Sequence, residues 1–152
     1  MGRGCSPSQR VGLSISWYVD SEQVSRRVIT TTGYEALARI LAGQWKLLGW
    51  VIRVGSDATP EDITDDQVYE PQLDLEPGVT VEIGEDYSRI IIAATASANQ
   101  LTGVTVGELG LVAKIEDETG TQREILVDRT AYGPATFGED KTFTCVIELH
   151  RW

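Results

Sequence analysis

The chain has little of what catalysis and metal binding commonly use. Its 152 residues include one histidine, His150, and two cysteines, Cys5 and Cys145, with no Cys-x-x-Cys pair. Structural zinc sites take four cysteine or histidine ligands, so no zinc site is expected. A serine nucleophile needs an oriented base beside it, and the sequence has neither a Gly-x-Ser-x-Gly elbow nor a second histidine. We therefore expect a protein that has no catalytic activity and no cofactor.

Long apolar segments are also missing. The longest uncharged apolar run covers residues 90–94, far short of the roughly 20 residues that a membrane helix needs. The arginines near the N-terminus are not followed by an apolar segment, so a signal peptide is not expected. We expect a protein that is made and assembled in a cytoplasm, without membrane contact. Cys5 and Cys145 are then expected to stay free thiols.

Positive charge is absent from residues 54–88, which contain eleven Asp and Glu but no Lys or Arg. The net charge of the whole chain is −10. Nonspecific nucleic-acid binding needs a basic surface, so no nucleic-acid partner is expected. Residues 1–53, by contrast, hold seven Lys and Arg and three acidic residues. A contact between neighbouring subunits could use this asymmetry through complementary charge, whereas a solvated acidic loop is the interpretation that the charge pattern favours.

The patterns that are present indicate β-strands. Between residues 11 and 19, apolar side chains alternate with small or polar ones, as in a half-buried strand. Further strand-like segments cover residues 28–31, 45–54, 79–83, 89–97, 107–115, 124–130 and 141–149. Turn residues separate them, and residues 79–97 are typical of a hairpin. The sequence predicts a mainly β protein, an antiparallel β-sandwich of about seven or eight strands with one short α-helix packed on it.

The helix is predicted over residues 33–42. Thr32 and Glu35 match a T-x-x-E capping box, in which each side chain bonds the other residue's backbone amide. Gly43 suits the position just after a helix end. The apolar face comprises Tyr34, Leu37, Ala38 and Leu41. A helix this short is marginal alone, so we expect it to dock on a sheet.

The chain is expected to form one domain with two appendages. Residues 1–10 are small and polar and predict a flexible N-terminal arm, while residues 11–152 form the β-sandwich-like domain. An acidic loop at residues 56–78 contains three prolines, and long loops of this kind are commonly functional or mobile. We expect the arm and the loop to serve as contact elements.

Two patterns invite a ligand-binding interpretation. The acidic loop offers candidate calcium ligands, namely Asp57, Glu61, Asp62, Asp65 and Asp66. Their spacing is not that of an EF-hand loop, so the pattern indicates calcium binding only weakly. A calcium- or carbohydrate-binding module, using this loop with Trp45 or Tyr69, is kept as an alternative. Residues 103–110 are glycine-rich but lack the lysine of a phosphate-binding loop and precede a strand, so the glycines predict tight turns or a bulge.

Four tryptophans are many for one small domain. Trp17 and Trp50 lie in strand patterns and are expected in the core. Trp45 and Trp152 lie near element ends, where a role as interface anchors is the alternative to packing.

From residue 28 onward the chain resembles the N-terminal domain of bacteriophage tail fibres, the phage tail-collar fibre family. The first matching motif is a Thr-x-x-Gly entry into a short Ala- and Leu-rich helix, residues 30–43. The second is a strand ending in Val54-Gly55 and followed by a loop with Pro60. The third is the phrase Glu108-Leu109-Gly110-Leu111, with two more strands after it.

This resemblance implies a virion structural role on the tail or baseplate, with other virion proteins as partners and a homo-oligomer, commonly a trimer. Residues 1–30 are additional to the family pattern, and the long fibre that follows this domain in the family is not present. Both points favour a free-standing adaptor, collar or decoration protein, with capsid decoration as a second hypothesis. The candidate interface residues are Arg3, Arg10, Trp45, Glu70, Glu108, Leu109 and Trp152.

Overall fold

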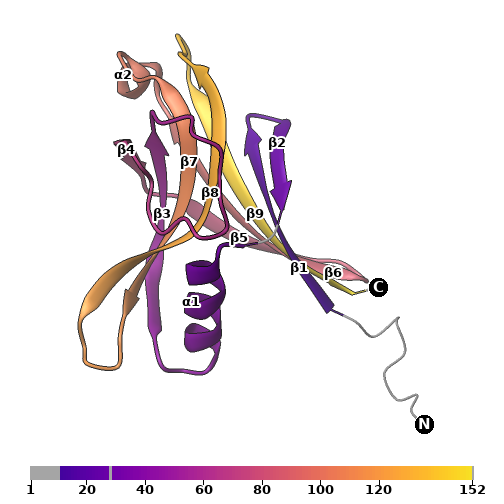
Figure 1. The fold of residues 1–152 in the computed structure, drawn as a ribbon. Helices are drawn as coiled ribbons and strands as arrows, with labels where there is room; N and C mark the ends of the chain where they lie inside the picture. Colours follow the sequence, from indigo (N-terminus) through magenta and orange to yellow (C-terminus); the bar gives the residue numbers. More distant parts are fainter. Residues whose placement is uncertain (1–10, 28, 152) are drawn as a thin grey trace.

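The computed structural model describes residues 11–27 and 29–151. They form two antiparallel sheets (Figure 1), with strand orders β2-β1-β9-β6-β5 in sheet A and β4-β3-β7-β8 in sheet B. Sheet A consists of β1 (Val11–Val19), β2 (Glu22–Arg27), β5 (Gly78–Ile83), β6 (Tyr87–Ala96) and β9 (Lys141–Arg151). Sheet B consists of β3 (Lys46–Gly55), β4 (Pro71–Leu75), β7 (Val106–Glu116) and β8 (Gln122–Ala135). The helices are α1 (Thr31–Leu41) and α2 (Ala98–Leu101). The predicted mainly β sandwich is confirmed.

The core lies between the two sheets. The alternation predicted for β1 is correct, since Ile15 and Trp17 are fully buried. They meet apolar side chains of β9 and of sheet B, among them Phe143, Cys145, Leu109, Leu111 and Ile115. Each large apolar side chain buried in this way contributes about 1.5–3 kcal/mol to folding. The indole nitrogen of Trp17 donates to Asp128 Oδ2 of β8 at 2.9 Å, so a buried hydrogen bond also joins the sheets.

Helix α1 begins two residues earlier than the capping-box pattern predicts. Its N-cap is Thr30, whose hydroxyl accepts from the amide of Gly33 at 3.1 Å. The same hydroxyl donates to the carbonyl of Val127 on β8 at 2.8 Å, so one side chain both caps the helix and docks it. Because Gly33 has no side chain, the start of the helix can lie directly on β8. A Cβ atom at this position would collide with that carbonyl.

The predicted cap residues have other partners. The hydroxyl of Thr32 donates to the carbonyl of Leu126 at 2.9 Å, and Glu35 pairs with Arg39 one turn later at 3.4 Å. The position of the helix start is set by docking on β8, because the carbonyls of that strand accept hydrogen bonds from the threonine hydroxyls. The residues around the helix start give no sign of these distant acceptors. Gly43 has the positive φ of 77° expected just after a helix end.

Two strands and one helix were not expected. The polar strand β2 pairs along β1, whereas Thr31 of the predicted 28–31 strand starts α1, and Val28 lies outside the described residues. Strand β4 lies within the predicted acidic loop and pairs with β3, which shortens the irregular part to residues 56–70. The four-residue helix α2 follows β6 and is capped by Ser97. Periodicity misses these elements because β2 is a polar edge strand and β4 and α2 are short.

The two sheets pack closely at one end and diverge at the other. In Figure 1 the β5–β6 hairpin and the end of β9 extend to the lower right, away from α1 and the β7–β8 hairpin. Side chains on the inner face of this extended part are consequently exposed, including Val81, Ile83 and Leu149. No helix in the described part of the chain has both the length and the apolar character needed to cross a membrane.

Candidate interaction surface

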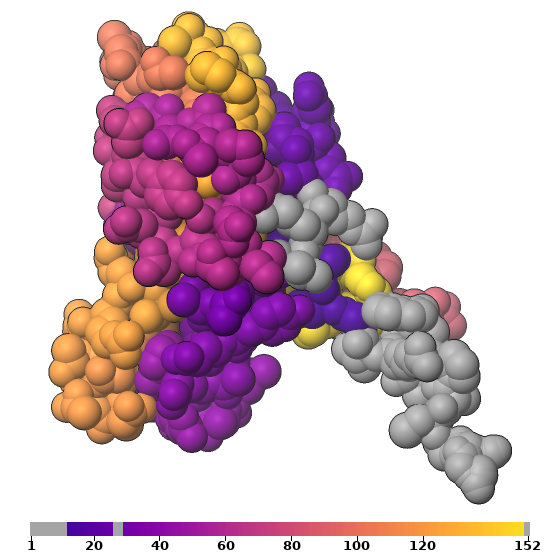
Figure 2. All heavy atoms as spheres, in the orientation of Figure 1, coloured from indigo at the N-terminus to yellow at the C-terminus, as the bar shows by residue number. Residues whose placement is uncertain are grey.

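Because β4 occupies part of the predicted 56–78 segment, the name acidic loop is used from here on for residues 56–70, which connect β3 to β4 and lie across the outer face of sheet B. Figure 2 shows this segment, in magenta, covering part of the sheet. Val68 of this loop packs on the sheet in a small apolar cluster with Val51, Val112 and Leu126, separate from the main core. Fixing a residue costs roughly 1–2 kcal/mol of backbone entropy, so a loop of this length needs specific anchors.

The first anchor is Glu108 of β7, which is fully buried. Its Oε1 accepts from the amide of Tyr69 at 2.8 Å. Its Oε2 accepts from the amides of Asp57 at 3.0 Å and Glu70 at 2.8 Å. One carboxylate thus binds both ends of the acidic loop.

The second anchor is Arg129 of β8, which is also fully buried. Its Nε donates to Glu108 Oε1 at 2.8 Å, and its Nη2 donates to the carbonyls of Asp57 and Thr59 at 3.0 Å. Burial acts to lower the pKa of Arg129, but the hydrogen bond and charge of Glu108 and the charge of Asp65 raise it overall, so the guanidinium stays charged.

Asp65 completes this group of three side chains, which we call the loop clamp. Its Oδ2 lies 3.3 Å from Nη1 of Arg129 and accepts from the amide of Asp62 at 2.9 Å. Its Oδ1 accepts from the hydroxyl of Tyr69, which raises the pKa of that phenol. The ring of Tyr69 in turn lies against the guanidinium, 4.0 Å from the ring centroid to Cζ of Arg129. The loop clamp holds its charges in a paired and hydrogen-bonded state, the condition under which buried charges are tolerated.

Glycines allow the loop to approach the sheet. A side chain at Gly107 would collide with the carbonyl of Ser56, and one at Gly110 would collide with Val68. The register between β7 and β8 also shifts at Gly107, but the extra residues lie on β8, which has three residues opposite the single Gly107. The irregularity is therefore opposite the glycine-rich phrase and not a bulge within it. The phrase Glu-Leu-Gly-Leu is therefore the surface on which the acidic loop is held.

The candidate calcium ligands serve other roles in this geometry. Asp57 and Asp62 cap local turns, and hydrogen bonds from Thr59 and Thr64 hold their pKa values below the ordinary range. Glu61 accepts from a threonine hydroxyl of β8, Asp65 belongs to the loop clamp and Asp66 is exposed. Within residues 11–27 and 29–151, no three His, Cys, Asp or Glu side chains form a group that could hold a metal ion.

The candidate interface residues divide into three sets. Glu70 is exposed beside the loop. Glu108 and Leu109 are fully buried, so their prediction as interface residues is wrong. Glu108 binds the acidic loop from within the protein, and Leu109 belongs to the core. Trp45 is also buried, and its indole nitrogen donates to Glu118 at 3.1 Å. Arg3, Arg10 and Trp152 lie outside the described residues, as does Cys5.

The sequence interpretation missed Arg129 and considered Tyr69 only as part of an alternative ligand-binding module. A signal existed for Arg129, since a charged residue inside the apolar stretch Ile-Leu-Val-Asp-Arg requires a buried partner. Nothing in the local sequence identifies Glu108 as that partner, because the two are 21 residues apart and meet only through the pairing of β7 and β8.

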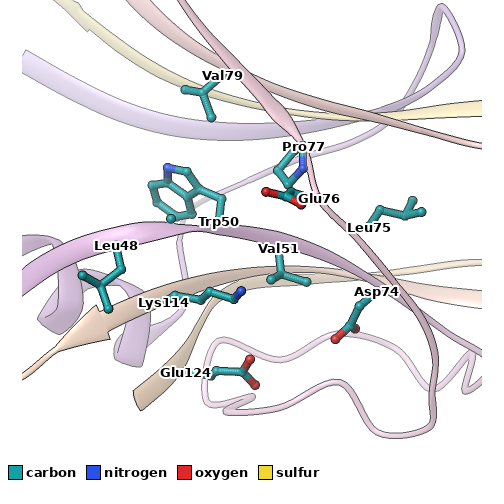
Figure 3. A pocket seen from close by; sticks show the side chains of 11 residues that line it. Leu48, Trp50, Val51, Asp74, Leu75, Glu76, Pro77, Val79, Lys114 and Glu124 are labelled. Carbon is teal, nitrogen blue, oxygen red and sulfur yellow. The ribbon is translucent and has the colours of Figure 1, made fainter. Parts of the chain in front are cut away.

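A groove of about 410 Å³ opens near the other end of sheet B (Figure 3). Trp50 and Val79 line it from facing sheets, and Lys114, Asp74 and Glu124 lie along one side. Arg53 bridges the two acids, at 2.7 Å from Asp74 and 3.1 Å from Glu124. Asp74 and Glu124 at the groove are therefore both paired with the neighbouring guanidinium of Arg53.

Comparisons with protein-family models, with curated proteins and with solved structures found no match to this chain.

Proposed function

We propose that the chain is a structural protein of a bacteriophage virion, an adaptor or fibre-attachment subunit of the tail, baseplate or collar. It acts through protein–protein contacts and performs no catalysis. The motifs shared with tail-fibre N-terminal domains support this assignment, and so does the β-sandwich with a short helix docked on it.

The observation that carries the proposal is the anchored acidic loop. Its surface presents two apolar side chains, Ile63 and Tyr69, which are 54% and 38% exposed. The same loop carries the exposed acids Asp62, Asp66 and Glu70, next to or within three residues of these side chains along the chain. An apolar and aromatic centre with a charged rim is typical of protein–protein interfaces.

The loop clamp links this surface to the resemblance. Glu108 belongs to the Glu-Leu-Gly-Leu phrase by which the chain resembles the family, and it binds both ends of the loop. A fixed, acidic surface suits assembly for two reasons. The loop is already ordered, so binding does not have to offset its loss of conformational entropy, and its negative charge steers a basic partner toward it.

Immunogold labelling of purified particles of the encoding phage tests the assignment. Label at the tail or baseplate is the expected result. Label over the head would instead support a capsid decoration protein, and particles without the protein would contradict both virion roles.

The loop surface is tested by incorporation of variants into particles. Ile63→Glu places a charge at the centre of the surface and is expected to reduce incorporation. Leu41→Glu is the matched control. Contrary to its predicted place on the docking face of α1, Leu41 is 88% exposed, and it lies outside the loop. Equal incorporation of the two variants would show that the acidic loop is not the contact.

A further inference from the structure

Strand β5 forms the outer edge of sheet A, and all six of its residues are exposed. Val79, Val81 and Ile83 are 47%, 63% and 72% exposed. The first two lie opposite Ile92 and Ile90 on β6, which face the core. These three side chains therefore continue the apolar inner face of sheet A. Val79 borders the groove that Trp50 also lines, and Val81 and Ile83 lie farther out, where they are the more exposed.

The other three edge strands of the described sheets carry features that hinder pairing with another chain. The ladder between β2 and β1 has a register shift, β4 begins with Pro71 beside another shift, and β8 contains Pro134 and two shifts. Bulges and prolines are the usual protection of sheet edges. Over its six residues β5 pairs in regular register with β6 and contains neither proline nor lysine.

The backbone of β5 shows which groups face outward. The amide of Gly84 donates to the carbonyl of Tyr87 at 2.8 Å across the turn that follows the strand. Because hydrogen-bonded and non-hydrogen-bonded pairs alternate in an antiparallel ladder, Val79, Val81 and Ile83 direct their backbone N–H and C=O groups away from β6. The residues with exposed apolar side chains thus also present hydrogen-bonding groups at the edge.

The sequence of β5 is self-complementary about Val81. Antiparallel pairing centred there places Val81 opposite its own copy and Val79 opposite Ile83, with their outward backbone groups facing each other. On the other face Thr80 lies opposite Glu82, so two carboxylates do not meet. Glu82 is moreover paired with Arg89 at 2.8 Å within its own subunit.

We propose that β5 pairs with β5 of a second copy of this chain, antiparallel about Val81, and so joins two five-stranded sheets into one. This inference rests on the proposed role in assembly and specifies one contact of it. A two-fold contact of this kind is isologous and closes as a dimer, whereas a trimer requires a heterologous contact. Three acids, Glu76, Glu85 and Asp86, flank the strand, so added salt is expected to strengthen the association.

The test is sedimentation velocity of the full chain from about 1 to about 200 µM, a range suited to a small interface. The expected result is a concentration-dependent shift from the 16.7 kDa chain mass to twice that mass. Val81→Lys places the lysine of one copy opposite the same lysine of the other copy. It is expected to raise the dissociation constant of the dimer at least about tenfold. Thr80→Lys is the matched control, because it places a lysine opposite Glu82 and leaves the dimer intact.

Disulfide capture tests the register. In a Cys5→Ser background, Val81→Cys is expected to give a covalent dimer on mild oxidation, since opposed residues in such a pair have Cα atoms about 5.5 Å apart. Thr80→Cys is expected to cross-link far less. A monomer at all concentrations, a dimer insensitive to Val81→Lys, or equal cross-linking of the two cysteine variants would each overturn the inference. A trimer would also overturn it while leaving the proposed virion role in place, and the labelling experiment tests that role separately.

Discussion

Replacing Glu108 with glutamine tests whether the loop clamp holds the acidic loop. Each carboxylate oxygen accepts two hydrogen bonds: Oε1 from Tyr69 and Arg129, and Oε2 from Asp57 and Glu70. Glutamine has one acceptor oxygen, and its NH₂ group would face two donors whichever way the amide is turned. The substitution also removes the anion closest to a buried cation. Breaking a buried ion pair by removing one partner costs about 3–5 kcal/mol.

For a chain of this size, such a loss lowers Tm by about 6–20 °C. Thermal and urea unfolding of Glu108→Gln would measure it. Asp74→Asn is the control, because Asp74 pairs with Arg53 at 2.7 Å but its side chain is 52% exposed. Exposed pairs contribute at most about 1 kcal/mol, so this variant is expected to remain close to the parent chain.

Hydrogen exchange separates a loop effect from general destabilisation. In Glu108→Gln the amides of Asp57, Tyr69 and Glu70 are expected to exchange faster than they do in a variant of equal stability altered in the main core. The reasoning is refuted if Glu108→Gln costs no more than Asp74→Asn, or if these amides keep their protection while the domain loses stability.

Three further predictions follow from the fold and the sequence. Gly33→Ala forces a methyl group against a β8 carbonyl and is expected to lower the free energy of urea unfolding by about 1–3 kcal/mol. Gly138→Ala is the control and leaves stability nearly unchanged, because nothing lies within 4 Å of a methyl group there. Equal effects of the two variants would refute the close docking of α1. Hydrogen bonds from threonine hydroxyls lower the pKa of Asp57 and Asp117 below the ordinary 3.8. The stability that these two ionised carboxylates contribute to the fold is therefore present above pH 3.8 and is lost as the pH falls through their folded-state pKa. A urea midpoint that stays constant between about pH 6 and about pH 3 would contradict this. Deleting residues 1–10 is expected to preserve the melting temperature but weaken incorporation into particles, and unchanged incorporation would argue against a role for the arm in assembly.

The local sequence pattern was sufficient to predict secondary structure wherever neighbouring elements bury one face of a segment. The alternation in β1, the hairpin of β5 and β6 and the glycine that ends α1 all follow from period and turn chemistry, because these signals lie within a few residues of one another. The fold class and the main strands were predictable for the same reason.

Local pattern failed where a distant strand supplies the partner. Thr30 replaces Thr32 as the helix cap because β8 offers its carbonyls to both hydroxyls. The polar strand β2 exists because β1 offers it an edge to pair with. In each case the deciding hydrogen bond joins residues that only the folded chain brings together.

The sequence by itself determined that the chain is acidic, mainly β and built as one sandwich, since composition and periodicity record which faces leave water. Only the tertiary structure decided what the acidic loop rests on and which sheet edge stays open. Glu108 and Arg129 are separated along the chain and become partners through the β7–β8 ladder. Likewise Val81 has the pattern of a half-buried strand residue, and it is exposed because the two sheets diverge before they reach it.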